Sequence, residues 1–145
     1  MLAMPVRDVL VDANVVLKWF HEEGEEEVEA ARALLDAHRD RTLAVQMLDL
    51  TPYEVGNALI RGRAGLGAAQ VAIVLRAVRE ICAAVTPNGE DLARATELAV
   101  DHDLTLYDAA YAAVAQRRGA TLTTLDGKLL ARGLGLRPRE LLSRG

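Results

Sequence analysis

Cysteine is nearly absent from this 145-residue sequence, which contains only Cys82. A single cysteine cannot form an internal disulfide, and it cannot supply the thiolates of a zinc site. Cys82 falls in the apolar stretch 81–85, where no basic neighbour or helix start would lower the pKa of its thiol. We therefore expect Cys82 to be a small core residue and not a nucleophile.

Long hydrophobic runs are also missing. No apolar stretch approaches the length of a membrane span, and the chain does not open with a charged start followed by an apolar segment and a cleavage site. We expect a soluble, cytoplasmic protein with no membrane partner. A length of 145 residues with 51% hydrophobic composition suits one compact domain, so we expect a single domain over 1–145.

A basic excess is lacking as well, because the formal net charge is −4. General polyanion binders usually carry a large positive charge, so this composition argues against that class without excluding a nuclease. Aromatic residues are too few to indicate a base-stacking platform. The sequence has no glycine-rich loop with lysine, and its three histidines show no ligand spacing, which disfavours a Walker-type site and a zinc site.

The sequence does contain an alternation of strand and helix patterns. Short apolar runs predict strands at 6–11, 42–47, 81–85 and 121–125, with an extended piece at 104–106. Periodicity and capping residues predict helices at 15–20, 25–38, 52–63, 68–80, 89–102, 108–118 and 127–132. The helices before and after 62–67 should form an antiparallel hairpin. This alternation predicts an α/β fold with helices on both faces of a parallel sheet.

Four acidic residues occur where strands end or helices begin. Asp12 and Asp126 follow predicted strands, while Glu54 and Asp108 lie at helix starts, the former behind Thr51 as the expected cap. Parallel sheets place their sites at the carboxyl ends of strands, so all four can converge there. Clustered carboxylates usually need cations, and Mg²⁺ or Mn²⁺ is the natural candidate. Taken singly, Glu54 or Asp108 could equally be a helix cap.

Four segments carry a family resemblance. They are VDANVVLKWF at 11–20, PYEVGNAL at 52–59, LYDAAYAAVA at 106–115 and LTTLDGKL at 122–129. In order and spacing they resemble the motifs of PIN-domain ribonucleases, in particular the VapC-type toxins of toxin–antitoxin pairs. The resemblance implies a three-layer α/β/α fold with a central parallel sheet. It also implies a catalytic metal site of Asp12, Glu54, Asp108 and Asp126, supported through hydrogen bonds by Asn14 and Thr124. Asn14 stands where many members have Ser or Thr.

The same resemblance implies an activity and partners. We expect an Mg²⁺- or Mn²⁺-dependent endoribonuclease that hydrolyses RNA and is the toxin of a toxin–antitoxin pair. The implied antitoxin would insert a basic side chain into the acidic pocket and would bind its own promoter DNA. The resemblance also implies homodimers built on the helical hairpin. Independently, the second helix of the hairpin has more apolar residues than one face needs: Val71, Ile73, Val74, Leu75 and Val78.

Several contacts and alternatives stay open at this stage. Some basic residues near the acidic edge are candidate substrate contacts but are better read as solvated surface charges: Lys18, Arg61, Arg63, Lys128 and Arg132. His21 is better read as a surface residue and Tyr111 as core packing. A phosphoacceptor receiver domain fits poorly, since Asp12 is followed by Ala13 and not by a second acid. A housekeeping RNA-processing nuclease, or an inactive RNA- or protein-binding module, would show the same motifs.

Overall fold

A computed structural model describes residues 6–20, 27–62 and 65–144. Four strands form one sheet: β1 (Arg7–Val11), β2 (Leu43–Leu48), β3 (Ala83–Val85) and β4 (Thr121–Thr123). The helices in these ranges are α1 (Ala13–Phe20), α2 (Val28–Arg39), α3 (Thr51–Arg61), α4 (Ala68–Ile81), α5 (Gly89–His102), α6 (Leu106–Arg118), α7 (Gly127–Ala131) and α8 (Pro138–Ser143). None of the helices described is both long and apolar enough to cross a bilayer.

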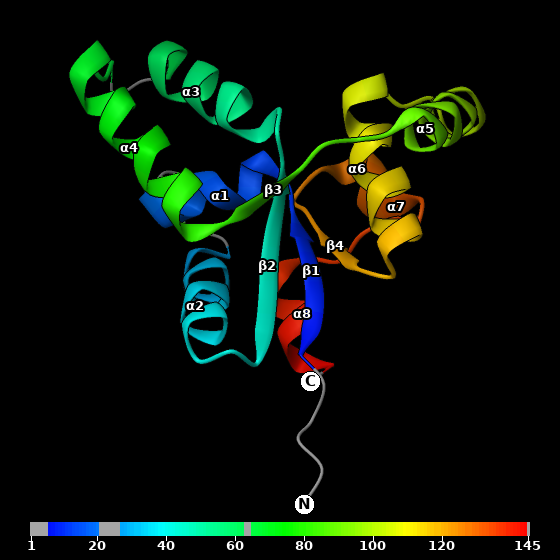
Figure 1. The fold of residues 1–145 in the computed structure, drawn as a ribbon, viewed down its shortest axis with the longest axis horizontal. Helices are drawn as coiled ribbons and strands as arrows, with labels where there is room; N and C mark the ends of the chain where they lie inside the picture. The colour runs from blue at the N-terminus through cyan, green and yellow to red at the C-terminus, as the bar shows by residue number, and fades with distance from the viewer. Residues whose placement is uncertain (1–5, 21–26, 63–64, 145) are drawn as a thin grey trace, which may run out of the picture.

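The sheet is entirely parallel, with strand order β3-β2-β1-β4. Val9 pairs with Val45 of β2, and Leu10 pairs with Leu122 of β4. Parallel strands must return by crossovers, and every crossover here contains at least one helix. The strand carboxyl ends therefore share one edge, the upper edge in Figure 1. The predicted α/β fold with a central parallel sheet is confirmed.

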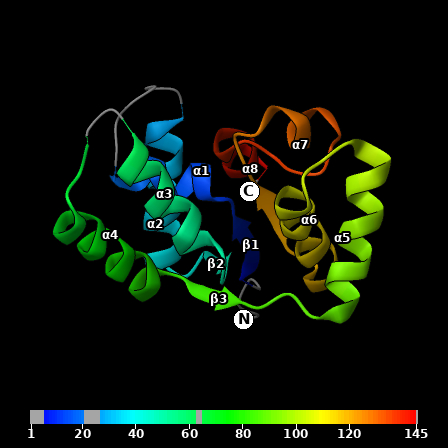
Figure 2. The same ribbon diagram turned by 90° about the horizontal axis from the view of Figure 1, so that it is seen from above.

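Alternating side chains along β1 divide the interior into two hydrophobic cores. Val9 and Val11 face a core that contains residues of α1, α2, α3, α4 and α8, while Leu10 faces a core formed with α5, α6 and α7. Figure 2 shows these two helical layers on opposite sides of the sheet. The arrangement is the three-layer α/β/α fold that the sequence resemblance implies.

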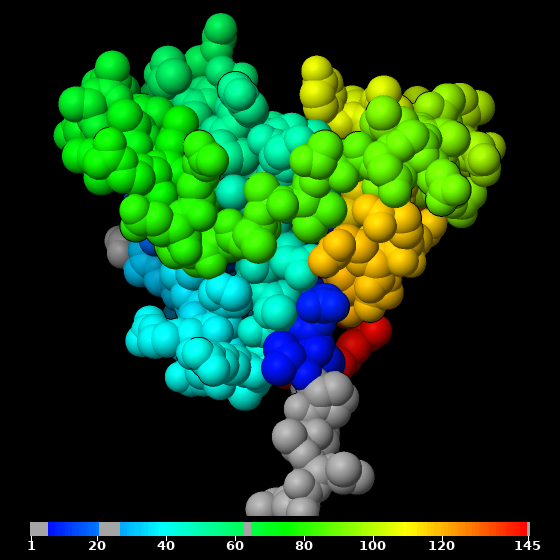
Figure 3. Space-filling view, viewed as in Figure 1, coloured from blue at the N-terminus to red at the C-terminus, as the bar shows by residue number. Residues whose placement is uncertain are grey.

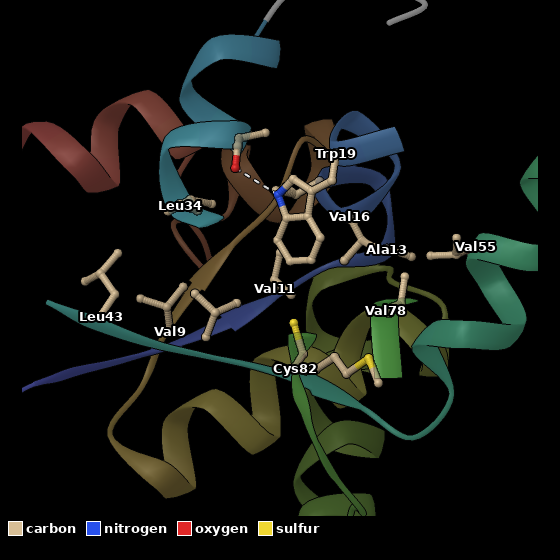
Figure 4. Close-up of a cluster of buried hydrophobic side chains, with 14 of the residues drawn as sticks. Val9, Val11, Ala13, Val16, Trp19, Leu34, Leu43, Val55, Val78 and Cys82 are labelled. Atoms are coloured by element: carbon tan, nitrogen blue, oxygen red, sulfur yellow. Dashed lines mark hydrogen bonds between the residues drawn. The ribbon is translucent and has the colours of Figure 1, made fainter. Parts of the chain in front are cut away.

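In the first core the short helix α1 packs against the longer helix α2. Trp19 of α1 is nearly buried, and its indole Nε1 donates a 2.8 Å hydrogen bond to the carbonyl of Ala31 in α2 (Figure 4). Cys82 lies in the same core, and burial raises the pKa of its thiol to about 12. The prediction that Cys82 is a small core residue is confirmed.

The second core is built around an alanine-rich helix. Residues 109–115 of α6 are all buried, so small side chains let this helix lie close to the sheet and to α5. The buried carboxylate of Asp91 in α5 accepts two hydrogen bonds from the Arg117 guanidinium, at 2.6 and 2.9 Å. This paired contact fixes α5 along α6 and engages one of the arginines near the end of α6.

The structure differs from the local predictions at four places. Thr51 is the first residue of α3 and not its cap, since the N-cap position falls on Leu50. Of the extended piece predicted at 104–106, Thr105 is extended as expected, but Leu106 already begins α6. The strand predicted from Ile81 begins only at Ala83, because α4 continues through Ile81. Helix α8 was not predicted at all.

Candidate active site

Asp12 lies directly after β1 at the carboxyl edge of the sheet. The residue is only 4% exposed, and α1 begins at the next residue. Its Oδ1 accepts a 2.7 Å hydrogen bond from the Ala13 amide, and its Oδ2 accepts one of 2.7 Å from the Thr124 hydroxyl. Burial raises the pKa of the Asp12 carboxyl to about 7, although both hydrogen bonds oppose this rise. The fold thus keeps a carboxyl group that is costly to ionise on its own.

Thr124 and Asn14 attach the segment after β4 to this carboxylate. The Thr124 hydroxyl donates to Asp12 and accepts a 3.0 Å hydrogen bond from the Asp126 amide. Asn14 Oδ1 accepts a 3.1 Å hydrogen bond from the Leu125 amide. Both side chains therefore make supporting hydrogen bonds. Asn14 bonds the backbone of the 124–126 segment, whereas Thr124 bonds Asp12 itself.

Glu54 is held from the opposite helical layer. The Tyr111 hydroxyl of α6 donates a 2.8 Å hydrogen bond to Glu54 Oε1. Because a phenol has one proton, the 2.6 Å contact between Tyr111 and Thr51 makes the Thr51 hydroxyl the donor. Thr51 Oγ1 in turn accepts from the amide of Leu48, the last residue of β2. A directed chain of hydrogen bonds thus runs from the end of β2 to Glu54.

The contact of Tyr111 with the site was not predicted from the sequence. Tyr111 is completely buried, as predicted for core packing, but its hydroxyl also touches an acidic side chain of the site. Burial raises the pKa of Tyr111 far above its usual range, with further contributions from Glu54 and Asp12, so the phenol remains a donor. A tyrosine three residues after Asp108, on the same face of α6, was the available signal.

Helix capping does not account for Glu54 or Asp108. Thr105 caps α6, since its hydroxyl accepts from the Asp108 amide at 3.1 Å, and α3 has no side-chain cap hydrogen bond. Asp126 is the residue that caps a helix. Its Oδ1 accepts from the amides of Lys128 and Leu129, both at 3.0 Å. A structural role is therefore evident for Asp126 beside any chemical one.

The four carboxyl groups are linked by their charges. Burial is the main cause that raises the pKa values of Glu54 and Asp108, and the charge of Asp108 raises the pKa of Glu54 further. The charges of Glu54 and Asp108 both raise the pKa of Asp12, and the charge of Asp126 raises the pKa of Asp108. Each carboxylate thus destabilises the ionised form of at least one neighbour.

A metal ion would relieve this repulsion. Within residues 6–20, 27–62 and 65–144, no three Asp, Glu, His or Cys side chains are close enough together to hold an ion as they stand. The donor set is nevertheless one of carboxylate oxygens, which are the ligands that hard divalent ions prefer. Coordination would therefore require the carboxylates to draw closer, and the positive charge would favour that movement.

The predicted basic contacts have other partners or lie elsewhere. Lys128 Nζ donates to the Asp103 carbonyl at 3.1 Å, and Arg132 Nε donates to the His102 carbonyl at 3.4 Å. Both cations therefore bind the carboxyl end of α5, where the helix dipole favours positive charge. Arg61 is exposed at the end of α3. Arg63 and His21 lie outside the described residues.

Comparison with known proteins decides the family. The family model for the PIN domain matches residues 9–133. The chain belongs to the PIN-domain family. Among curated PIN relatives, "Exonuclease VapC9" of Pyrobaculum aerophilum is 36% identical over 106 residues, covering 70% of this chain and 79% of the relative. "Ribonuclease VapC3" of the same organism is 35% identical over 125 residues, covering 83% and 91% respectively.

Solved PIN structures share the fold. PAE2754 from Pyrobaculum aerophilum superposes with a TM-score of 0.71 at 30% identity, covering 95% of this chain and 88% of that one. A chain of a toxin–antitoxin complex from Klebsiella pneumoniae gives a TM-score of 0.68 at 18% identity, covering 90% and 97%. The resemblance to PIN domains seen in the four sequence motifs is therefore confirmed over most of the chain.

Proposed function

We propose that this PIN domain is a metal-dependent endoribonuclease and the toxin of a toxin–antitoxin pair. The observation that carries the proposal is Asp12, a buried carboxyl group at a sheet edge whose pKa is raised by burial and by two neighbouring carboxylates. Such a group needs either a proton or a cation. The names of the two curated relatives, a ribonuclease and an exonuclease, support nucleic-acid hydrolysis as the reason for this arrangement.

The proposed mechanism gives each residue a task. Asp12, Glu54, Asp108 and Asp126 would hold Mg²⁺ or Mn²⁺, which supplies Lewis-acid stabilisation of a phosphodiester undergoing displacement. Thr124 fixes Oδ2 of Asp12, and Tyr111 fixes Oε1 of Glu54, so each carboxylate keeps one orientation. Asn14 holds the backbone beside Asp126. Because these partners come from both helical layers, the site depends on the whole fold.

The cut is proposed to be internal to the RNA. The relatives' names include both a ribonuclease and an exonuclease, so the two modes must be separated by experiment. A circular single-stranded RNA has no end, and only an endonuclease can open it. We expect the purified protein to linearise circular RNA in Mg²⁺ buffer, whereas degradation of linear RNA alone would make the protein an exonuclease.

The toxin role predicts an antitoxin and a cellular effect. The match to a chain of a solved toxin–antitoxin complex supports such a partner. A basic side chain from the antitoxin would replace the positive charge of the metal in the acidic site. RNA as substrate puts the expected site of action in the cytoplasm. Expression of this chain alone should arrest growth, and Asp12→Asn should not. If wild-type expression leaves growth untouched while the protein still cuts RNA, the chain is an RNA-processing nuclease and not a toxin.

We also propose that residues 1–145 act as one domain that forms a homodimer through the α3–α4 hairpin. The apolar surplus predicted for α4 is smaller than the sequence indicated. Val71 and Val78 are buried within this chain, Val74 and Leu75 pack partly against its core, and Ile73 is 68% exposed. Ile60 of α3 is also exposed, at 59%. Light scattering at micromolar concentration should show a dimer, and Ile73→Glu should convert it to a monomer.

A further inference from the structure

The five aromatic residues of the chain fall into two groups. Trp19 and Tyr111 are buried, and Phe20 packs partly buried against the first core. The other two are Tyr53, which is 77% exposed, and Tyr107, which is 66% exposed. Each exposed tyrosine immediately precedes an acidic residue of the candidate site, Glu54 and Asp108 respectively. The surface aromatic groups of this chain are therefore confined to the sequence neighbours of two site carboxylates.

The two tyrosines belong to opposite layers of the fold. Tyr53 lies in the first turn of α3, and Tyr107 lies in the first turn of α6. The two helix starts lie close together, since Tyr111, one turn after Tyr107 in α6, donates a 2.8 Å hydrogen bond to Glu54 of α3. Consecutive residues on a helix point about 100° apart, so each ring lies beside its carboxylate and not over it. Figure 3 shows the surface hollowed between the arm formed by α3 and α4 and the arm formed by α5 and α6.

The protein's own charge is unfavourable for binding a polyanion at this edge. The edge contains four acidic residues, the whole chain has a net charge of −4, and the side chains of Lys128 and Arg132 bind the carbonyl groups of α5. A neutral contact to the substrate would therefore add affinity beyond that of a bound metal ion. Aromatic rings provide one, since every nucleobase has a face that can stack on a ring. The tyrosine rings are exposed and adjacent to the chemistry, as this task requires.

We infer that Tyr53 and Tyr107 stack on two unpaired nucleobases, one on each side of the RNA bond that is cut. The inference rests on the proposed ribonuclease function and assigns to that site two residues that position the substrate. Bases within a duplex are already stacked on their neighbours and are not open to a protein ring. The tyrosines would thus position the strand and select single-stranded regions without reading a particular sequence. The prediction from composition that the chain lacks a stacking platform would then be wrong, because two well-placed rings suffice.

The first test compares Tyr53→Ala and Tyr107→Ala with Tyr53→Phe and Tyr107→Phe, on single-stranded oligoadenylate in Mg²⁺ buffer. Val100→Ala is the matched control, since Val100 is 77% exposed on α5. Each alanine variant should raise KM by roughly 5- to 150-fold with kcat nearly unchanged, because stacking binds ground state and transition state alike. The phenylalanine variants and the control should match wild type. The dependence of KM on salt should also stay the same, because no charge is removed.

A second test pairs each tyrosine with one base. An abasic site is placed in turn at each nucleotide near the cleaved bond of the same oligonucleotide. At one position, removal of the base should raise KM as much as Tyr107→Ala does. The two changes together should raise KM no further than either change alone. A different position should behave in this way with Tyr53→Ala. If the effects of base removal and of the tyrosine substitutions on KM combine in full at every position, the inference is overturned, because ring and base then do not touch.

Failure of the inference and failure of the proposed function are distinguishable. If wild type cleaves the RNA and both alanine variants keep its KM, stacking is overturned and the ribonuclease stands. If wild type cleaves nothing, the ribonuclease is overturned, and fluorescence anisotropy with labelled oligoadenylate decides stacking alone: weaker binding by both alanine variants supports it, and equal binding overturns it. Alanine variants that keep RNA binding but escape the antitoxin would also overturn it, because the rings would then be partner contacts.

Discussion

The Tyr111 hydroxyl donates a 2.8 Å hydrogen bond to Glu54 Oε1, so a buried residue of α6 orients a carboxylate of α3. The two residues are 57 positions apart in sequence and come from opposite layers of the sandwich. The same phenol accepts from Thr51, which is bonded to the end of β2. This relationship joins the sheet, the two layers and the acidic site in one chain of hydrogen bonds.

Tyr111→Phe should therefore reduce both activity and stability. Glu54 would lose its donor and Thr51 its acceptor inside the fold, at a cost of about 1–3 kcal/mol in the free energy of unfolding. Partners of this kind also set activity, so RNA cleavage should fall by roughly 10- to 100-fold. Urea unfolding and initial cleavage rates measure the two effects. Tyr53→Phe is the matched control for stability, because that ring is exposed; equal effects of the two changes would contradict the account.

Two adjacent threonines should respond oppositely to the same substitution. Thr124 donates to Asp12, whereas the buried Thr123 hydroxyl has no hydrogen-bond partner among the described residues. Thr123 shares its sheet face with Val11, which packs in the first hydrophobic core. Thr123→Val should leave cleavage intact and raise stability by about 1 kcal/mol, since an unsatisfied polar group is removed. Thr124→Val should lower cleavage by roughly 10- to 100-fold. Thermal unfolding and cleavage rates of the pair decide the point.

Gly135 should be intolerant of any side chain. A Cβ at this position would lie 2.7 Å from Thr124 Cγ2 and 3.3 Å from the Leu122 carbonyl oxygen. Gly135→Ala would therefore push Thr124 away from Asp12, and we expect a stability loss of about 1–3 kcal/mol together with reduced cleavage. Gly89→Ala is the control, because a Cβ there meets nothing within 4 Å. Wild-type cleavage by Gly135→Ala would show that the placement of Thr124 is not critical.

The pH dependence of stability should reflect the raised pKa of Asp12. Its folded pKa of about 7 exceeds the usual 3.8, so between these values the folded chain retains a proton that the unfolded chain has lost. The free energy of unfolding in metal-free buffer should then fall as pH rises from about 4 to about 7, by on the order of 4 kcal/mol from this group. Asp12→Asn should flatten this slope and be as stable as wild type, or more stable, at pH 8. Denaturant titrations at several pH values provide the measurement, and an unchanged slope in the variant would refute the assignment.

The general fold and the acidic residues were accessible from the sequence because both leave local signals. Alternating apolar runs and caps such as Asn88 mark strands and helices, and Asp12 stands out because it follows a buried strand directly. The strand order left no such signal, since pairing of β1 with β4 joins residues more than a hundred positions apart. Helix α8 is six residues long, too short for a periodic pattern to emerge.

The supporting contacts of the site were harder to foresee. The sequence marks Tyr111 as an apolar-face residue of an alanine-rich helix, and only tertiary packing brings its hydroxyl to Glu54. Lys128 and Arg132 were candidate substrate contacts because they lie near the acids in sequence, although a surface charge was the preferred interpretation. In the fold they reach instead to the end of α5. Partners of long side chains depend on the packing of distant elements, which local sequence does not encode.

RNA cleavage by wild type and Asp12→Asn, each with and without divalent ions, tests the central proposal most directly. Asp101→Asn, which removes an exposed carboxylate of α5, is the matched control for loss of one negative charge. We predict that wild type and Asp101→Asn cut single-stranded RNA in Mg²⁺ or Mn²⁺ and stop in EDTA, and that Asp12→Asn is inactive in both although it remains folded. Cleavage by folded Asp12→Asn at the wild-type rate, or undiminished wild-type cleavage in EDTA, would contradict the proposed acidic metal site.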